Sequence, residues 1–375
     1  MNAPTRQQDR LPARTILVGL GSIGLAIAKA VRKLDTVEVV SAVDPAPGRA
    51  GKDLGRVLGE DASAGITIKS ELEDALRSSR PRLCLLATGS RLHEVADDIF
   101  TLIGHGCSVI TTAEEMANPV LHDRELAEKM DEACKRRGVV VVMAGVNPGF
   151  VMDRLVLTLA QVTRDIQRVE VTRVVDANRR RPQLLARMGG GMSPTLFAER
   201  ALDGGVGHVG LRESMYLVAR GLGWRLTDYR ESISPEVVRE TMSTPVGVLE
   251  RGQIRGATQR ARGYVGGEEK ITFILEIAAA SENPRDEIFI HGTPPVHITI
   301  PEGCSGDEAT ISLVASSIPF ALFARPGLRL VTEVPADPRA LQGLVDHSAP
   351  ARPAPRKKAP AKSSRNGKAA SPRAR

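Results

Sequence analysis

Short apolar runs alternate with amphipathic segments over the first 150 residues of the chain. The runs are nearly continuous in Val, Ile and Leu, as strands covered on both faces must be. We expect strands at Thr15–Gly19, Val37–Val43, Ile66–Lys69, Arg82–Ala87, Ser108–Thr112 and Val139–Ala144. Helical spacing of apolar residues is found between them, over Ile23–Leu34, Glu71–Ser78, Arg91–Ile103 and Val120–Arg137. This alternation predicts an α/β fold with helices around a doubly wound parallel sheet.

The pattern changes after the turn Asn147-Pro148-Gly149. A helix is expected over Phe150–Val162, a long strand over Ile166–Val175, and glycine-rich helical material from Met188 to Gly223. Alternating segments then predict strands over Val246–Tyr264, Lys270–Ala280, Glu287–His291 and Val296–Ile300. This part is typical of an α+β domain with a mostly antiparallel sheet. Apolar helical residues return at Ala309–Phe323.

These boundaries divide the chain into five parts. We expect a disordered N-terminus (1–14), a first domain (15–147), an α+β domain for substrate and oligomer contacts (148–304), a helical return onto the first domain (305–335) and a disordered basic tail (336–375). The formal net charge of +7 comes from this tail, which carries nine Lys or Arg after Pro350 and no acid. Its composition is that of a disordered segment and it lacks aromatic residues for base stacking, so a solubilising tail is favoured over one that contacts nucleic acid.

Composition also indicates where the protein is located in the cell and whether it has a metal site or a disulfide. No apolar run is long enough to span a membrane, and the polar N-terminus lacks the apolar core of a signal peptide. The four cysteines form no CxxC pair and have no nearby His at metal-ligand spacing. We therefore expect a cytoplasmic protein with no metal and no disulfide.

The most informative motif is Gly19-Leu20-Gly21-Ser22-Ile23-Gly24, which fits G-x-G-x-x-G. It ends the first predicted strand and opens the first predicted helix, the context in which this pattern indicates a Rossmann domain. Gly19 permits the tight turn, Gly21 lets the backbone approach a pyrophosphate, and Gly24 allows close helix–strand packing. The helix N-terminus at Ser22 and Ile23 offers N–H groups to the phosphates of NAD or NADP.

Three later loops are expected to complete the cofactor site. Asp44 closes the second strand, where an acid binds the ribose hydroxyls and favours NAD, although Arg49 and Lys52 follow and can neutralise a 2′-phosphate. Thr88-Gly89 and Thr112 follow the fourth and fifth strands, at the edge of the sheet where the nicotinamide would lie. Glu114 either faces this crevice or only places a negative charge at the N-terminus of the next helix, where the helix dipole favours it.

The second half carries the candidate substrate groups. His208 lies in a glycine-rich helix entrance, and a histidine side chain ordinarily titrates near neutrality, so His208 and Glu114 are the candidate proton acceptors. Asp176 ends a strand and the arginine run Arg179–Arg181 follows it, and arginine binds carboxylates bidentately. We expect a substrate site formed by Asn147, at the crossing between domains, with Asp176, Arg179, Arg180 and Arg285.

Several ordered segments together resemble the 2,4-diaminopentanoate dehydrogenase-like branch of the dihydrodipicolinate reductase superfamily. They include Gly145–Asp153, Val174–Ala177, Gly207–Ser214, Ala261–Tyr264, Pro284–Glu287, Gly292–Pro295 and Gly306–Thr310. True dihydrodipicolinate reductases carry catalytic His and Lys residues after the strand that ends here at Asp176. This chain has Asn178-Arg179-Arg180-Arg181 instead, which argues against dihydrodipicolinate reduction.

The resemblance implies an amine dehydrogenase of amino acid metabolism. Such an enzyme transfers hydride from an amino-bearing carbon, here of a small diamino acid, to NAD or NADP, and water hydrolyses the imine to a ketone and ammonia. The resemblance also implies a homo-oligomer built through the second-domain sheet. The alternatives are an imine or carbonyl reductase of the dihydrodipicolinate reductase type, or a non-enzymatic NAD(P)H-binding sensor.

Overall fold

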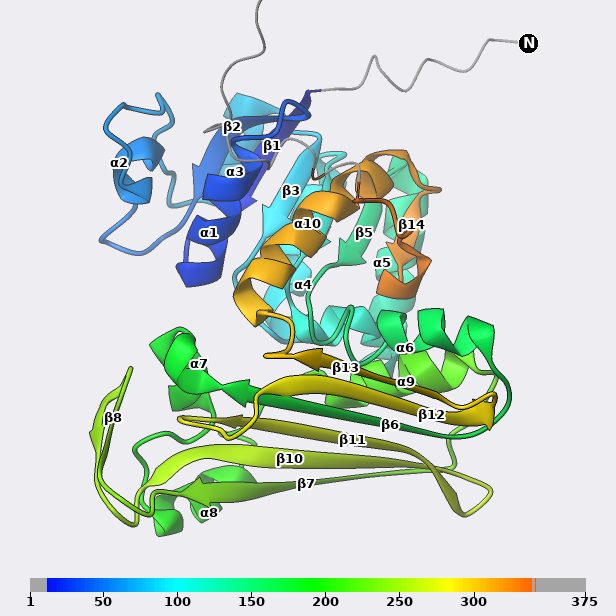
Figure 1. The fold of residues 1–375 in the computed structure, drawn as a ribbon. Helices are drawn as coiled ribbons and strands as arrows, with labels where there is room; N and C mark the ends of the chain where they lie inside the picture. The colour runs from blue at the N-terminus through cyan, green and yellow to red at the C-terminus, as the bar shows by residue number, and fades with distance from the viewer. Residues whose placement is uncertain (1–11, 339–340, 342–375) are drawn as a thin grey trace, which may run out of the picture. The chain divides into compact units, whose positions relative to one another are not determined.

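The computed structural model describes residues 12–338 and 341, which contain two six-stranded sheets (Figure 1). The first sheet has the order β14-β5-β4-β3-β1-β2, and every neighbouring pair is parallel. Its strands are β1 (Ala13–Val18), β2 (Val37–Val43), β3 (Leu83–Leu86), β4 (Ser108–Thr111), β5 (Val140–Met143) and β14 (Gly327–Arg329). Because parallel neighbours run in one direction, the loops after β1, β3 and β4 meet at one edge of the sheet.

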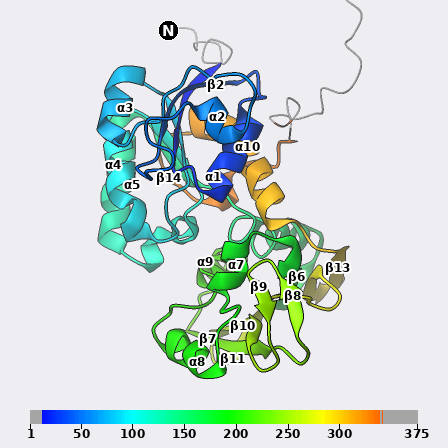
Figure 2. The ribbon, with the colours of Figure 1, turned by 90° about the vertical axis from the view of Figure 1, so that its left-hand side faces the viewer.

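Helices cover both faces of this sheet (Figure 2). One face packs against α3 (Leu72–Ser79), α4 (Leu92–Gly104) and α5 (Arg124–Arg137). The other face packs against α1 (Ser22–Val31) and α10 (Gly306–Phe323). A short helix, α2 (Leu54–Leu58), lies between β2 and α3 in the chain. The helix α10 thus completes the cover of the first sheet, although it follows the second sheet in the chain.

The second sheet has the order β13-β12-β6-β11-β10-β7. Its strands are β6 (Arg164–Asp176), β7 (Asp228–Val237), β10 (Ile254–Val265), β11 (Glu268–Ala278), β12 (Arg285–Thr293) and β13 (Val296–Pro301). Only the pair of β6 and β11 is parallel; the other neighbours are antiparallel. A separate hairpin joins β8 (Met242–Thr244) to β9 (Gly247–Leu249).

One face of the second sheet forms an apolar core with four helices. They are α6 (Arg154–Leu159), α7 (Pro182–Arg187), α8 (Pro194–Leu202) and α9 (Leu211–Gly221). Val169, Val171 and Phe273 point into this core and are fully buried. Side chains alternate between faces along a strand, so Glu170 and Ile274 lie on the opposite face and remain partly exposed.

The segment that leads from the first sheet to the second is held by Asp153, whose side chain is fully buried. Its carboxylate accepts hydrogen bonds from the Gly149 N–H (2.7 Å), the Arg154 N–H (2.6 Å) and the Ser214 hydroxyl (2.8 Å). Because Ser214 belongs to α9, these bonds fix the crossing segment to a helix of the second part. Asn147, at the start of this segment, therefore has a defined position.

The predicted fold class is confirmed, and several of its elements differ from the expected ones. The strand expected over Ile66–Lys69 is reduced to two isolated bridges, a parallel one from Val43 to Lys69 and an antiparallel one from Asp53 to Thr67. The helix expected from Val120 begins at Arg124, because the side chain of Asp123 caps it by accepting a hydrogen bond from the Leu126 N–H. The strand β7 was not expected at all, since its polar sequence lacks an apolar run.

The predicted domain limits 15–147, 148–304 and 305–335 stay a prediction. β1 begins at Ala13, inside the expected N-terminal extension, and residues 1–11 of that extension lie outside the described residues. Most of the expected tail, 336–375, is also outside them. No helix in the described part is long and apolar enough to cross a membrane.

Candidate active site

The turn between β1 and α1 is shaped by its glycines. Gly19 adopts a φ of 84°, and a Cβ placed there would lie 2.5 Å from the carbonyl oxygen of Ala87. A Cβ at Gly24 would lie 1.9 Å from the carbonyl oxygen of Gly19, so α1 packs directly on the turn that precedes it. Among the described residues, no atom other than those of its chain neighbours lies within 4 Å of a Cβ placed on Gly21, which leaves open space at the helix N-terminus.

This cradle fits the pyrophosphate of a nicotinamide dinucleotide. No side chain caps α1, so the N–H groups of its first turn, at Ser22 and Ile23, are available to an anion. The helix dipole also favours negative charge at this end. Gly21 leaves the space that a pyrophosphate needs to approach the backbone.

Asp44 lies at the end of β2 beside this turn and is buried. Its carboxylate accepts hydrogen bonds from the Leu20 N–H (2.8 Å), the Ala46 N–H (2.9 Å) and the Arg49 guanidinium (2.9 Å). Burial acts to raise its pKa, but these donors hold the pKa of Asp44 below its ordinary value. Asp44 is therefore ionised where ribose hydroxyls would bind. The guanidinium of Arg49 lies beside it and can also bind a 2′-phosphate.

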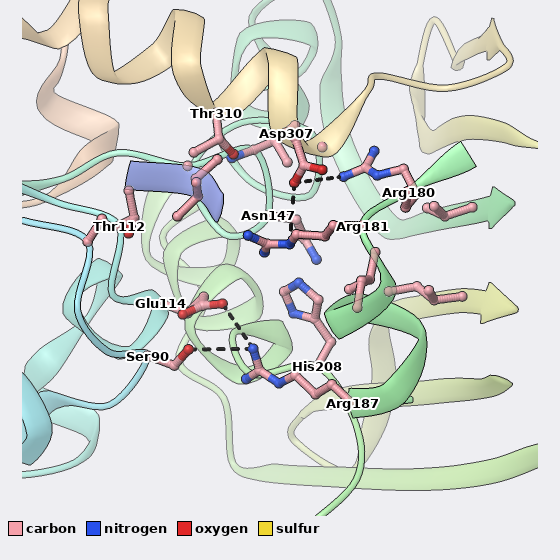
Figure 3. A pocket seen from close by; sticks show the side chains of 18 of the residues that line it. Ser90, Thr112, Glu114, Asn147, Arg180, Arg181, Arg187, His208, Asp307 and Thr310 are labelled. Atoms are coloured by element: carbon pink, nitrogen blue, oxygen red, sulfur yellow. Dashed lines mark hydrogen bonds and ion pairs between the residues drawn. The ribbon is translucent and has the colours of Figure 1, made fainter. Parts of the chain in front are cut away.

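A cavity of about 240 Å³ opens next to these loops. The first sheet contributes one wall through the loops after β1, β3 and β4, with Ile23, Thr88, Gly89, Ser90, Thr112 and Glu114. The other wall comes from β6, α7, α10 and the loop before α9, with Arg173, Arg180, Arg181, Arg187, His208 and Asp307. Figure 3 shows Glu114 and Ser90 at one end of the cavity, Asp307 at the other, and Asn147 and His208 between them.

Glu114 belongs to a 3₁₀ turn (Glu114–Ala117) after β4, and its side chain is 16% exposed. Burial raises its pKa above the ordinary value, while Arg187 and Ser90 act in the opposite direction. The Arg187 Nη1 atom lies 3.4 Å from Glu114 Oε1 and 3.4 Å from the Ser90 hydroxyl. Glu114 is thus a carboxylate that can exchange a proton closer to neutrality than an exposed glutamate.

His208 faces the cavity as a neutral ring. Burial, with a smaller contribution from the charge of Arg187, lowers its pKa to about 3. Its Nδ1 lies 2.5 Å from the carbonyl oxygen of Val209, which can only accept, so Nδ1 carries the hydrogen and Nε2 is an acceptor. Gln259 holds the backbone of His208 on both sides, accepting from its N–H (2.6 Å) and donating to its carbonyl oxygen (3.1 Å).

The middle of the cavity contains polar atoms that no other described residue satisfies. Asn147 is 7% exposed, and both its amide oxygen and its amide nitrogen lack a hydrogen-bond partner. The Nε atoms of Arg180 and Arg181 are also buried without a hydrogen-bond partner. Buried polar atoms of this kind are costly unless a ligand or water meets them. They therefore mark a surface that a polar ligand or water can satisfy.

Three of the expected substrate residues do not reach this cavity. Arg285 lies on β12 and pairs with Glu287 (3.0 Å). Side chains alternate along a strand, so the neighbouring Asp286 points inward and Arg285 does not. Asp176 accepts hydrogen bonds from the Asn178 and Ala280 N–H groups and so holds the turn after β6.

Arg179 has a side chain that is 71% exposed and pairs with Glu302 (2.6 Å). It lines a neighbouring cavity together with Asp176. The substrate-binding role expected for Asp176 and the carboxylate-binding role expected for Arg179 and Arg285 are therefore not supported in the cavity next to the glycine-rich turn.

Eight of the other candidates meet there, joined by residues to which the sequence assigned no role, whereas Gly19, Gly21, Ser22, Gly24 and Asp44 belong to the neighbouring turn and strand end. Asn147, Arg180, Glu114, His208, Ile23, Thr88, Gly89 and Thr112 line one cavity. Arg187 and Asp307 also line it. Nothing in the local sequence marks Arg187, whereas Asp307 lies in the segment Gly306–Thr310 that carries the family resemblance. Arg181 belongs to the arginine run Arg179–Arg181, and its place next to Arg180 is the feature of the sequence that points to the cavity.

The comparisons with known proteins agree with this architecture. The family model for the 2,4-diaminopentanoate dehydrogenase C-terminal domain matches residues 150–350. The chain is 30% identical over 341 residues to the 2,4-diaminopentanoate dehydrogenase of Acetoanaerobium sticklandii, covering 88% of this chain and 95% of that protein.

A solved structure has a similar fold. The amine dehydrogenase from Mycobacterium smegmatis superimposes with a TM-score of 0.79 at 20% identity, covering 86% of this chain and 96% of that one. The long match in sequence, supported by the match to the family model, confirms the resemblance seen in the sequence. The chain belongs to the 2,4-diaminopentanoate dehydrogenase family.

Proposed function

We propose that this enzyme oxidises the amino-bearing carbon of a small diamino acid with NAD or NADP, giving a ketone and ammonia. The observation that carries the proposal is one cavity that joins the glycine-rich dinucleotide loops to Glu114, His208 and a cluster of arginines. The name of the curated relative supplies the substrate class. The arginines support a substrate with a carboxylate, because a guanidinium binds a carboxylate through two hydrogen bonds.

The glycine-rich turn and Asp44 would hold the cofactor, whose nicotinamide accepts a hydride when it is bound. Ile23, Thr88, Gly89 and Thr112 would border the ring. The protein then has to present the substrate amine, accept its proton and keep the reacting carbon in place.

We assign proton transfer to Glu114. Its raised pKa suits a general base near neutral or alkaline pH, whereas a ring with a pKa of about 3 is a poor base. As the carbon–hydrogen bond gives up its electron pair, the amine proton passes to Glu114 and a carbon–nitrogen double bond forms on the substrate. Water then adds to this imine and ammonia leaves. His208 Nε2 accepts a hydrogen bond from the amine and orients it.

The decisive experiment measures initial rates of NAD+ and NADP+ reduction, together with ammonia release, across a panel of diamino acids at alkaline pH. We expect turnover with stoichiometric ammonia, and a loss of about 100-fold or more in kcat for Glu114→Gln. The control is Glu128→Gln, since Glu128 is exposed on α5. If cofactor binds but no amine releases ammonia, the proposal is wrong.

We further propose a cytoplasmic homo-oligomer. The face of the second sheet that carries Glu170, Ile274 and Phe289 points away from the apolar core, and it mixes apolar residues with charges of both signs. Such a face can pair with its own copy across a two-fold axis. Light scattering of the purified chain should give a mass above that of one chain, and a monomer at micromolar concentration would contradict this assignment.

A further inference from the structure

The cavity contains two carboxylates, one at each end (Figure 3). Glu114 lies at the end near the cofactor loops, where the reaction proposed above uses it. Asp307 lies at the other end, in the first turn of α10. The oxidation of a single amine needs only one acidic partner. Asp307 is therefore a charged group in the cavity that the reaction leaves without a role.

Asp307 is held between two guanidinium groups without being hydrogen bonded by them. Its Oδ1 lies 3.4 Å from Arg180 Nη2 and 3.7 Å from Arg181 Nε. Among the described residues, no hydrogen bond ends on this carboxylate. Its side chain is 30% exposed, so its oxygen lone pairs remain open to a donor that enters the cavity.

The same end of the cavity has a positive charge in excess. Arg180 and Arg181 together carry one more charge than Asp307 balances, and the Arg180 side chain is only 11% exposed. Gly306 lets the guanidinium approach α10, because a Cβ there would lie 2.0 Å from Arg180 Nη2. The unpartnered amide of Asn147 lines the cavity beside them. One ligand carboxylate would neutralise this cluster and meet the unsatisfied N–H groups.

An amino acid carries its carboxylate and its α-ammonium on one carbon atom. Partners for the two groups must therefore be neighbours, with arginine for the carboxylate and an acid for the ammonium. Arg180, Arg181 and Asp307 have this arrangement. We propose that Asp307 binds the non-reacting α-ammonium of the substrate while Arg180 and Arg181 bind its carboxylate. This inference rests on the proposed function, and it makes Asp307 the residue that selects diamino acids over monoamino acids.

The test compares 2,4-diaminopentanoate with 4-aminopentanoate, which lacks only the α-amino group. For the native enzyme we expect kcat/KM to favour the diamino acid by about 10- to 100-fold, the usual worth of a hydrogen bond to a charged group. In Asp307→Asn this preference should fall to within about threefold, with little change for 4-aminopentanoate. The matched control is Glu308→Gln, because Glu308 is the exposed neighbour of Asp307 on α10.

Two kinetic results would overturn the proposal. One is a native enzyme that does not prefer the diamino acid. The other is a variant that loses activity equally on both substrates, which would mean that Asp307 only positions the arginines. Calorimetric titration of 2,4-diaminopentanoate into native and variant enzyme tests the subsite independently of turnover. An unchanged Kd refutes the α-ammonium contact even if no amine is oxidised, whereas absent turnover with a weakened Kd refutes only the proposed reaction.

Discussion

Arg187 is the side chain that couples the two walls of the cavity. It lies 3.4 Å from both Glu114 and the Ser90 hydroxyl, and its Nε donates to the Gly207 carbonyl oxygen at 3.1 Å, next to His208. The substitution Arg187→Met keeps most of the side-chain length and removes the charge. Removing a nearby cation makes a carboxyl harder to ionise, so the pKa of Glu114 should rise further above its ordinary value.

The size of this effect follows from the geometry. Two unit charges 3.4 Å apart interact by about 5 kcal/mol at an effective dielectric constant of ~20. Relaxation and water reduce this, and carboxyls beside an arginine usually shift by about one to three pKa units. Each unit corresponds to about 1.4 kcal/mol. At a pH below both pKa values, the ionised fraction of Glu114 should therefore fall about 10- to 1,000-fold.

The assay is the pH dependence of kcat with saturating diamino acid, from neutral to strongly alkaline pH. A base must be ionised to act, so activity is lost as the pH falls through its pKa, and the acidic limb should move to higher pH by about one to three units in the variant. His208 does not contribute to this limb, since its pKa of about 3 keeps it neutral. Arg200→Met is the control, because Arg200 is exposed on α8. An acidic limb that stays in place would refute the coupling between Arg187 and Glu114.

Four further substitutions give sharp outcomes. Gly24→Ala forces a Cβ against a carbonyl oxygen, and this overpacking should destabilise the fold by about 1–3 kcal/mol or more and lower the Tm in thermal melts by several degrees. Gly21→Ala should leave the Tm nearly unchanged and weaken NAD+ binding about tenfold in fluorescence titrations. Gln259→Leu leaves the N–H and the carbonyl oxygen of His208 unpaired and should cost about tenfold in kcat/KM with cofactor affinity retained; an unchanged rate would show that His208 needs no such support. Asp44→Asn removes the charge that repels a 2′-phosphate and should move the ratio of kcat/KM for NADP+ over NAD+ upward by about tenfold, and a fall in that ratio would contradict the assignment.

The local features of the site could be predicted because they depend on neighbouring residues. The glycine-rich turn follows from steric contacts within a strand, a turn and a helix, and the structure places Gly19 and Gly24 where such contacts demand a glycine, while Gly21 borders open space. The loops after β3 and β4 could also be predicted, since parallel strands bring their carboxyl ends to one edge. Asn147 was found from its place at the change of pattern along the chain.

The remaining features depend on register and on distant contacts. Arg285 and Asp286 differ by one position on β12, and this single step decides which of them points inward. The pairing of Arg187 with Glu114 joins residues 73 positions apart, and nothing near either residue announces the other. The strand β7 is an edge strand with a polar sequence, held by its pairing with β10 rather than by an apolar run.

The late return of α10 onto the first sheet has a consequence for biosynthesis. Ile311, Val314 and Ile318 fill the core over that sheet, yet they are synthesised after the entire second sheet. A nascent chain that ends before Gly306 therefore exposes the apolar face that these side chains cover. Such a face is prone to aggregation until the helix arrives. Expression of the N-terminal 150 residues alone should thus yield insoluble protein, and chaperone dependence should end once translation has passed Phe323.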